Sequence, residues 1–491
     1  MDQTLPNFIR QTPYPLLIDG KEMPSESGAT FATINPDTGE VLAQVARASA
    51  PDVDRAVQAA RRAFEGPWGK ATPRERSKAL MRLASILNDK AEMLAQIEML
   101  DVGKPIKQSR ASTISLAPTI EYYASVLLSL TGETINISDP TLMDFTLREP
   151  LGVCGLIVPW NYPVSLAVLK MAPALAAGNT VIIKPSEVTP LSTTELGLAV
   201  MEAGIPPGVV NIVHGTGPEA GEALARHPGV AKISFTGGTV TGRAIFRAAA
   251  DSIKRLTLEL GGKSPLLVFA DSNIDAAVTT AYNDMTRNTG QVCAACTRLV
   301  LERPIAEEFL EKLSKKVAGV KIGRPQDNDT EMGPIVNKTQ VERIHSYLKV
   351  AQEEGVQTVR HVDLSGRAEL QRGFYMDPVL FLGANNSMRV AREEIFGPVQ
   401  TVLTFDTEEE GVRIANDSPY GLAASIFTRD AARAMRMTRL IQAGTVCINH
   451  GAKASVDAPF GGYKESGIGK ERGMLAMLDD TQVKNVRYSI Q

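Results

Sequence analysis

Short apolar segments alternate with helical segments between residues 151 and 270, and this alternation constrains the fold more than any other feature of the sequence. It predicts strands at 153–158, 180–183, 209–213, 231–235, 256–259 and 265–269. Strands joined by right-handed helical crossovers form a parallel sheet that is covered by helices. We therefore predict a doubly wound α/β fold, in which ligands bind at the carboxyl ends of the strands.

The remainder of the chain requires further hydrophobic cores. A chain of 491 residues is too long for one ordinary core, so we expect two or three domains. A second alternating series runs from about 273 to 450, with strands predicted at 298–301, 399–405 and 445–448. This series indicates a second α/β domain. Helical pattern from about 73 to 130, broken at Gly103-Lys104-Pro105, predicts helices that cover a sheet.

Two segments alternate apolar and polar residues but have no obvious partner nearby. They lie at 143–148 and at 486–490, close to the end of the chain. Such alternation predicts half-buried strands. Two interpretations remain open: an edge hairpin with a frayed tail, or strands that add to the sheet of a neighbouring subunit.

Charge and hydropathy exclude several classes of partner. The net charge is −3 and the pI is near 6.1, and no long run of Lys and Arg is present, so we do not expect nucleic-acid binding. No uninterrupted apolar stretch approaches the length of a membrane span, and residues 1–20 lack the apolar centre of a signal peptide. We expect a soluble, cytoplasmic protein.

The four cysteines, at 154, 293, 296 and 447, do not predict a disulfide scaffold in so long a chain. Cys293 and Cys296 form a C-x-x-C, but no second pair or nearby histidine completes a zinc site, and the surroundings do not fit a thioredoxin-like pair. We therefore predict no metal site. For Cys296 we favour a packed, inert thiol; a reversible disulfide with Cys293 is the alternative.

Two residues are suited to covalent catalysis. Cys293 follows a Gly290-Gln291 turn next to an expected helix end, where we expect a lowered thiol pKa and a nucleophilic thiolate. Glu259 closes a predicted strand, where partial burial would raise its pKa towards that of a useful general base. Each residue alone fits a structural role as well, because a cysteine is often a small buried hydrophobe and a strand-end acid is often solvated.

Polar residues also follow the first two strands of the 151–270 series. Asn161, within Pro159-Trp160-Asn161-Tyr162-Pro163, carries an amide suited to donate to an oxyanion, although such an Asn often only caps its turn. Lys184 and Glu187 are suited to hold the hydroxyls of a ribose. An acid at this position favours an unphosphorylated ribose, and hence NAD+ over NADP+.

The glycine pattern for a dinucleotide is irregular. The usual G-x-G-x-x-G is absent between strand and helix. Gly237 and Gly242 instead join a strand to a helix, and Gly215-Thr216-Gly217 stands one unit earlier. Either turn would point a helix N-terminus towards a pyrophosphate.

Taken together, these blocks resemble the aldehyde dehydrogenase superfamily, in its order and at its spacing, over nearly the whole chain. The matching blocks are 159–163, 184–187, 237–242, 259–265, 290–298, 393–398 and 459–471. Relatives that pass the acyl group to coenzyme A lack an acid at the position of Glu259. The resemblance therefore implies a hydrolytic, non-CoA-acylating enzyme that releases a free carboxylic acid.

The resemblance implies a role for each matched residue. Cys293 would be the nucleophile, Glu259 the general base and Asn161 the oxyanion donor. The cofactor, NAD+ with NADP+ possible, would be bound by Trp160, Lys184, Glu187, Gly237, Gly242, Glu394 and Phe396.

The resemblance also implies a domain organisation. Residues 1–127 and 149–261, with a return segment at 453–477, would form an NAD(P)-binding domain of Rossmann type, and 262–452 would form the catalytic α/β domain. Residues 128–148 and 478–491 would be the strands of a small β oligomerisation domain, which would account for the two unpartnered segments. A homodimer or a homotetramer is expected.

The substrate is the least constrained part of the interpretation. By alignment with the family, the aldehyde tunnel would be lined by Tyr162, Leu166, Leu169, Arg287, Ala454 and Ser455. The apolar lining favours a medium-sized or bulky apolar aldehyde, and no aromatic cage for a quaternary ammonium is evident, which disfavours betaine aldehyde. Two alternatives remain: a succinic-type semialdehyde dehydrogenase that clamps a carboxylate with Arg287, and a non-catalytic relative with a structural role.

Overall fold

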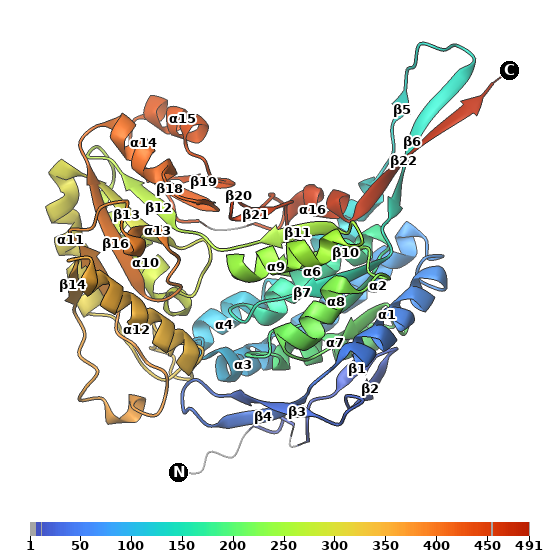
Figure 1. The fold of residues 1–491 in the computed structure, drawn as a ribbon, viewed down its shortest axis with the longest axis horizontal. Helices are drawn as coiled ribbons and strands as arrows, with labels where there is room; N and C mark the ends of the chain where they lie inside the picture. Colours follow the sequence, from blue (N-terminus) through green and yellow to red (C-terminus); the bar gives the residue numbers. More distant parts are fainter. Residues whose placement is uncertain (1–5, 11, 453–454, 491) are drawn as a thin grey trace.

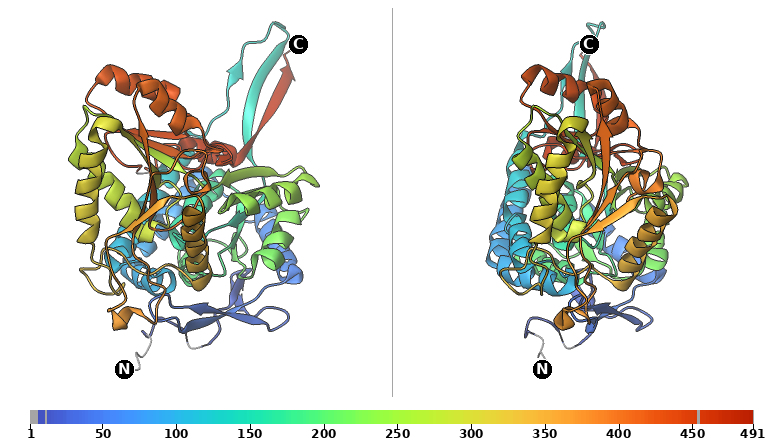
Figure 2. Two further views of the ribbon diagram at one scale, coloured as in Figure 1. Left: turned by 60° about the vertical axis from the view of Figure 1, so that its left-hand side comes forward. Right: turned by 90° about the vertical axis from the view of Figure 1, so that its left-hand side faces the viewer.

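The structure is a computed structural model that describes residues 6–10, 12–452 and 455–490. Two α/β lobes lie side by side, and a narrow β arm projects from one of them and carries the C-terminus (Figures 1 and 2). A hairpin of β3 (Thr30–Ile34) and β4 (Val41–Ala46) lies at the opposite side of the molecule from the arm. No helix among the described residues is long and apolar enough to cross a membrane.

The first lobe is built around an eight-stranded sheet. In sheet order its strands are β2 (Lys21–Met23), β1 (Leu16–Ile18), β9 (Val210–Ile212), β8 (Thr180–Lys184), β7 (Val153–Ile157), β10 (Lys232–Thr236), β11 (Arg255–Glu259) and β21 (Gly467–Ile468). Strands β9, β8, β7, β10 and β11 are parallel, and the order of the chain reverses between β7 and β10. This arrangement is the doubly wound order with its switch point at β7 and β10. The strands predicted between 153 and 259 are thus confirmed.

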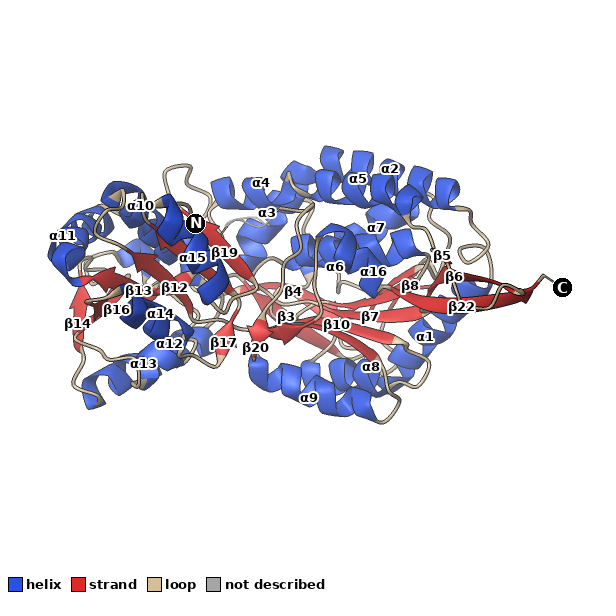
Figure 3. Cartoon of the chain, turned by 90° about the horizontal axis from the view of Figure 1, so that it is seen from above, coloured by secondary structure: helices blue, strands red, loops and turns tan. Residues whose placement is uncertain are grey.

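Both faces of this sheet are buried under helices (Figure 3). Along β8, Val181 and Ile183 join one hydrophobic core and Ile182 the other, because successive side chains of a strand point to opposite faces. On one face lie α1 (Ala50–Glu65), α8 (Glu222–Arg226) and α9 (Thr239–Ala250). On the other lie α2 (Pro73–Asp89), α3 (Ala91–Val102), α4 (Ile106–Thr113), α5 (Leu116–Val126), α6 (Pro163–Ala177), α7 (Leu191–Glu202) and α16 (Gly473–Asp479).

The second lobe contains a seven-stranded sheet, parallel except for its edge strand β14. Its strands in order are β14 (Gln357–Arg360), β15 (Val379–Leu382), β16 (Val399–Phe405), β13 (Cys296–Glu302), β12 (Ser264–Val268), β18 (Ala423–Phe427) and β19 (Thr445–Ile448). The helices of this lobe are α10 (Ile274–Thr286), α11 (Arg303–Ala318), α12 (Lys338–Glu353), α13 (Arg389–Arg392), α14 (Glu408–Asn416) and α15 (Ala431–Leu440). The short remaining elements are η1 (Leu127–Ser129), η2 (Gly217–Gly221), η3 (Arg287–Gly290), η4 (Ala368–Leu370), β17 (Tyr420–Gly421) and β20 (Tyr463–Lys464).

Strand β12 corrects one element of the sequence prediction. Strand-helix alternation alone made it the last strand of the 151–270 series, but it lies in the centre of the second sheet rather than in the first. The domain bounds implied by the family resemblance, with a catalytic domain from residue 262, had put it in the second domain. Only residues 260–263 separate it from β11, and no helix intervenes. Since a parallel neighbour in the same sheet requires a crossover of a dozen or more residues, so short a connection sends the chain into another sheet.

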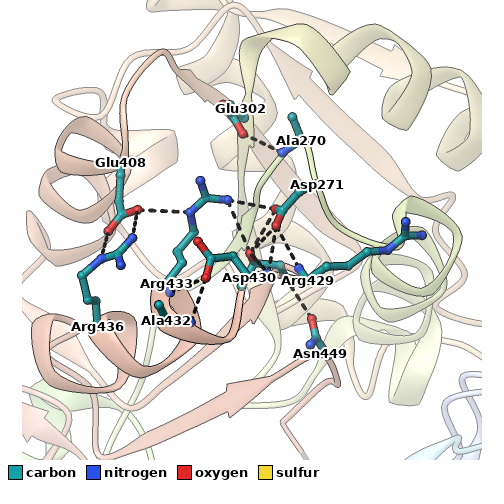
Figure 4. Close-up of polar contacts among 11 residues, drawn as sticks. Ala270, Asp271, Glu302, Glu408, Arg429, Asp430, Ala432, Arg433, Arg436 and Asn449 are labelled. Carbon is teal, nitrogen blue, oxygen red and sulfur yellow. Dashed lines mark hydrogen bonds and ion pairs between the residues drawn. The ribbon is translucent and has the colours of Figure 1, made fainter.

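Hydrogen bonds and ion pairs connect the carboxyl ends of the central strands of the second sheet to neighbouring helices (Figure 4). Asp271, which follows β12, accepts hydrogen bonds from the Thr428 hydroxyl at 2.9 Å and from the Arg433 guanidinium at 2.9 Å. Glu408 of α14 pairs with Arg433 and Arg436 of α15. The carboxyl ends of β12 and β18 are therefore tied to two helices, while the opposite ends of β12 and β13 follow the segments that carry Glu259 and Cys293.

The arm resolves the two unpartnered segments. It is a three-stranded sheet of β5 (Thr134–Ile135), β6 (Leu142–Pro150) and β22 (Thr481–Ser489), in which β22 pairs antiparallel with β6 from Thr481↔Pro150 to Ser489↔Leu142. The two segments are therefore each other's partners, and the C-terminal segment is an ordered strand rather than a frayed tail. Sequence periodicity could not show this pairing because 330 residues, 151–480, separate the two strands.

Candidate active site

The loops after β7, β10 and β11 meet at the switch point of the first sheet. The Gly237 N–H, just after β10, donates to the carbonyl of Glu259 at 3.0 Å, and Glu259 is the last residue of β11. Asn161 follows β7 and is buried. The sequence prediction thus placed Asn161, Glu259 and Gly237 at one edge of the sheet, and the structure brings them to that edge.

Cys293 approaches from the second lobe on a strained loop. Asn288 and Thr289 have φ angles of 45° and 55°, in the left-handed region that non-glycine residues rarely adopt. The strain is held by hydrogen bonds: the Asn288 amide donates to the Asn161 carbonyl at 3.2 Å, and the Thr289 hydroxyl donates to the Gly333 carbonyl at 2.9 Å. Backbone strain of this kind is maintained where surrounding contacts over-determine the conformation, often at functional sites.

The side chain of Asn161 is oriented by the same loop. Its Nδ2 donates to the Gln291 carbonyl at 3.0 Å. An amide nitrogen carries two N–H groups, so this bond fixes the plane of the amide and leaves a second donor. Asn161 and the segment that carries Cys293 are therefore joined directly.

Glu259 lies in a buried setting that opposes its charge. Neither carboxylate oxygen has a hydrogen-bond partner among the residues that the structure describes. Burial first, and then the negative charge of Glu471, raise the pKa of Glu259 well above its usual range, although Lys170, Lys470 and Arg472 act in the opposite direction. A carboxyl with a raised pKa is suited to exchange a proton near neutral pH.

The prediction for the pKa of Cys293 was wrong in direction. Burial, followed by the negative charges of Glu394 and Glu259, raises the pKa of the thiol to about 12. Cys293 lies in a turn between η3 and β13 rather than at a helix N-terminus, so no helix dipole favours the thiolate. In this structure Cys293 is a thiol.

Lys184 and Glu187, which were predicted to hold the hydroxyls of a ribose, form an ion pair with each other. Lys184 Nζ lies 2.9 Å from Glu187 Oε2, and the Gly217 N–H donates to Glu187 Oε1 at 3.3 Å. Burial tends to raise the pKa of Glu187, but Lys184 and the N–H donors outweigh it, and the pKa is lowered. Glu187 is therefore a carboxylate at the carboxyl end of β8.

A second group of predicted residues lies nearer to Cys293. Trp160 and Phe396 meet edge to face with ring centroids 5.2 Å apart, and Phe396 has a left-handed φ of 63°. Glu394 Oε1 accepts from the Gly262 N–H at 3.1 Å, and burial raises the pKa of Glu394 to about 7. The segment 394–396 therefore contacts the turn that connects Glu259 to the second lobe.

Comparison with known proteins decides the family. The model of the aldehyde dehydrogenase family matches residues 23–486. The chain is 42% identical over 478 residues to a putative aldehyde dehydrogenase, DhaS, of Bacillus subtilis, covering 97% of this chain and 96% of that protein. It is 41% identical to an aldehyde dehydrogenase of Aspergillus niger, covering 99% of this chain and 97% of that one. The chain belongs to the aldehyde dehydrogenase family.

Solved structures support the same assignment for the fold of this aldehyde dehydrogenase. A putative aldehyde dehydrogenase from Burkholderia cenocepacia superposes with a TM-score of 0.95 at 42% identity, covering 97% of this chain and 98% of that one. Betaine aldehyde dehydrogenase from Staphylococcus aureus, solved in complex with NAD+, superposes with a TM-score of 0.95 at 37% identity, covering 98% and 96%. The α/β fold class predicted from the sequence is confirmed.

The residues predicted for the substrate tunnel of this aldehyde dehydrogenase differ in burial. Tyr162 is the residue before α6, and Leu166 of that helix is partly buried. Leu169 is buried one turn further, beside a small cavity that Lys170 and Glu471 also line. Ser455 is exposed and donates to Asp457, and Ala454 lies outside the described residues.

Arg287 precedes the strained loop of this aldehyde dehydrogenase. Its guanidinium lies 3.6 Å from the carboxylate of Asp284, three residues earlier on the chain. Asp284 also accepts from the Cys296 N–H at 3.0 Å, and Cys296 is buried. This geometry favours the pairing of Arg287 with Asp284, and a packed role for Cys296.

Sequence reasoning missed the residues that hold the start of α6 in this aldehyde dehydrogenase. Lys104 and Glu98 form a fully buried ion pair with 3.0 Å between Nζ and Oε2, and Glu98 also accepts from the Val164 N–H at 3.2 Å. Lys104 Nζ stands 4.0 Å from the centre of the Tyr162 ring. The only signal was the Gly103-Lys104-Pro105 break, which was interpreted as an interruption between helices.

Proposed function

We propose that this enzyme oxidises an aldehyde to the carboxylic acid with NAD+, through a thioester on Cys293. The observation that carries the proposal is the convergence of three groups from different segments: Cys293 on its strained loop, the Asn161 amide that the same loop orients, and the buried, unpartnered carboxyl of Glu259. These are a nucleophile, an oxyanion donor and a general base, the set that acyl chemistry needs.

The first lobe fits a dinucleotide. The hydroxyl of Thr236, which lies just before the N-terminus of α9, is buried without a partner among the described residues. A Cβ at Gly238, the N-cap of α9, would meet nothing within 4 Å, so open space lies in front of this helix end. Helix N-termini favour phosphate groups, and an unpartnered hydroxyl supplies a further donor. Gly237 and Gly242 would frame this site.

The other predicted residues complete the cofactor site. Lys184 and Glu187 would hold the adenosine ribose, while Trp160, Glu394 and Phe396 would position the nicotinamide half. When bound, NAD+ accepts a hydride from the carbon that is being oxidised. The solved relative from S. aureus in complex with NAD+ supports this cofactor.

The steps on the protein follow from the three groups. Cys293 loses its thiol proton, one of the two H+ that the overall reaction releases to solvent, as its sulfur bonds to the aldehyde carbon, and the second N–H of Asn161 stabilises the oxygen as it gains charge. After hydride transfer the substrate is a thioester on Cys293. Glu259 accepts a proton from water, which attacks the thioester carbon and releases the acid and the thiol. The sum is RCHO + NAD+ + H2O → RCOO− + NADH + 2H+.

Glu259 also determines which molecule accepts the acyl group. A base at position 259 favours water as the acyl acceptor, so we propose release of a free acid rather than transfer to coenzyme A.

We also propose a division into domains. It comprises a cofactor domain at 1–127 and 149–261 with the return segment 453–477, a catalytic domain at 262–452, and oligomerisation strands at 128–148 and 478–491. The pairing of β21 with β11 supports the return segment.

We propose an apolar aldehyde as substrate. The pairing of Arg287 with Asp284 supports this choice, because a paired guanidinium is less available to clamp a substrate carboxylate. Buried Leu169 supplies no second cation, so a carboxylate would be desolvated with little compensation.

NADH absorbance across a panel of aldehydes tests activity and substrate together. We expect a higher kcat/KM for an apolar aldehyde of about six to ten carbons than for succinic semialdehyde or betaine aldehyde, by about tenfold or more, since one unpaired charge costs at least 1.4 kcal/mol. The opposite ranking, with loss of semialdehyde activity in Arg287→Ala, would show a carboxylate clamp. No NADH with any aldehyde would favour a non-catalytic relative.

A further inference from the structure

A small cavity between β12, β13 and β17 has a lining that carries cations and no carboxylate. Its volume is about 10 Å3, room for one water-sized group. Lys263, Ser264 and Arg298 line it, together with neutral residues that include Tyr420 and Gln442. None of the residues proposed for catalysis or cofactor binding lines it.

Lys263 supplies an unsatisfied donor to this cavity. The side chain is 2% exposed, and its Nζ has no hydrogen-bond partner among the described residues. Burial first, and then Arg298, lower the pKa of Lys263 to about 7, while Glu394 and Glu393 raise it. A buried amine without a partner is costly, and a counter-charge next to it would remove that cost.

Arg298 is a second buried cation in the same wall. It is 1% exposed, and its donors go to neutral acceptors, among them the carbonyls of Lys263 at 2.8 Å, Ile414 at 2.8 Å and Ala415 at 2.7 Å. These bonds fix the guanidinium but do not neutralise it.

Two acids act electrostatically on these cations, Glu394 on Lys263 and Asp417 on Arg298, but each also has another partner. Glu394 accepts from the Gly262 N–H at 3.1 Å, and Asp417 pairs with Arg392 at 3.1 Å. Ser264 adds a buried hydroxyl that has no partner among the described residues. The lining therefore offers two buried cations and a buried hydroxyl to a small space, and the exposed Gln442 is one of the residues that line it.

We propose that this cavity binds a monatomic monovalent anion, such as chloride, on Lys263 and Ser264. The anion neutralises the buried ammonium and accepts from the Ser264 hydroxyl. It braces the turn at 261–263, which holds Glu394 through the Gly262 N–H.

Bromide is the probe for this site. In crystals of the full-length protein soaked in bromide, an anomalous peak is expected within hydrogen-bond distance of Lys263 Nζ and Ser264 Oγ. In solution, replacing potassium gluconate by potassium bromide at constant ionic strength is expected to give a saturable rise in Tm, because a ligand of the folded state stabilises it by mass action.

Variants separate this site from general salt effects. Lys263→Met removes the cation without leaving a buried charge, and is expected to abolish both the peak and the rise in Tm. Ser264→Ala deletes a hydroxyl without a protein partner and should fold even if Lys263→Met does not; it is expected to weaken the halide effect. Lys315→Met, an exposed lysine on α11, should retain the effect.

Two results would overturn the proposal. One is the absence of a bromide peak at Lys263 in crystals that show bromide elsewhere on the surface. The other is a peak without any difference in halide response between the unmodified protein and Ser264→Ala, which means binding at crystal concentration only.

Discussion

At the scale of single residues, the surroundings of Cys293 keep its thiol protonated until substrate or cofactor changes them. Burial and two nearby carboxylates raise the pKa of the thiol to about 12. Nucleophilicity resides in the thiolate, so the protein stores the cysteine in an unreactive form. The same carboxylates are the residues proposed to position the cofactor and to activate water.

The raised pKa predicts how the cysteine reacts with an alkylating agent. Without cofactor, the rate of iodoacetamide labelling of Cys293 should rise by about tenfold per pH unit between about pH 7 and pH 9, since the thiolate fraction grows in this proportion below the pKa. Peptide mass spectrometry measures the rate, with Cys293→Ala as the control for the three buried cysteines. A plateau below pH 9 would mean that the thiol ionises near its usual pKa or lower.

Glu187 predicts the choice of cofactor. Its carboxylate would accept from ribose hydroxyls and repel a 2′-phosphate, so kcat/KM should be higher with NAD+ than with NADP+. Glu187→Gln should lower the ratio of kcat/KM with NAD+ to kcat/KM with NADP+ by about tenfold, which corresponds to about 1.4 kcal/mol. Glu219→Gln is a matched control, because Glu219 follows β9 nearby but is paired with Arg47 at the surface. Equal or better kcat/KM with NADP+ in the unmodified enzyme would refute the role of Glu187.

At the scale of elements, sequence pattern predicted strands and helices well and their partners less well. The strands of the first sheet were readable because both faces are buried and helices separate them. Strand-helix alternation assigned β12 to the first sheet, because an apolar segment alone does not show that no crossover helix connects it to β11. The pairing of β6 with β22 could not be predicted, since apolar and polar residues alternate along each strand but this pattern does not specify the partner strand.

The arm has one apolar face. In the register of β6 and β22, Met143 stands opposite Tyr488 and Phe145 opposite Val486, while the other face pairs Asp144 with Arg487. Met143 is 50% exposed and Tyr488 63% exposed. An isolated three-stranded sheet with exposed apolar side chains is marginal in water, so we propose that this face packs on another subunit in a homodimer or homotetramer.

A charge on the apolar face of the arm tests this proposal. Tyr488→Asp should shift the assembly to a smaller species, because a carboxylate would be buried without a partner. Val483→Asp is the matched control, since Val483 is similarly exposed on the same strand but faces the other side. Light scattering after size exclusion measures both. A monomeric unmodified protein, or equal behaviour of the two variants, would contradict the proposal.

At the scale of the whole molecule, the proposed site lies where the carboxyl ends of the strands of the first sheet face the amino ends of strands of the second sheet. The carboxyl edge of the first sheet supplies Asn161 and Glu259, and the segment entering β13 of the second sheet supplies Cys293. The residues proposed for the site could be singled out in the sequence because short motifs carry them. The hydrogen bond between Asn161 and Gln291, the strain at Asn288 and Thr289, and the Lys104–Glu98 pair could not, because they depend on contacts between segments far apart in the sequence.

In the proposed mechanism Cys293 carries an acyl group that Glu259 helps water to remove. The most direct measurement mixes Glu259→Gln with NAD+ and a six-carbon aldehyde, and follows NADH together with the mass of the Cys293 peptide. We expect a burst of about one NADH per subunit, slow turnover afterwards, and an acyl adduct on Cys293. Cys293→Ala should give neither burst nor adduct while still binding NAD+. Turnover of Glu259→Gln near the unmodified rate, or a folded variant that forms NADH without an adduct on Cys293, would rule out this mechanism.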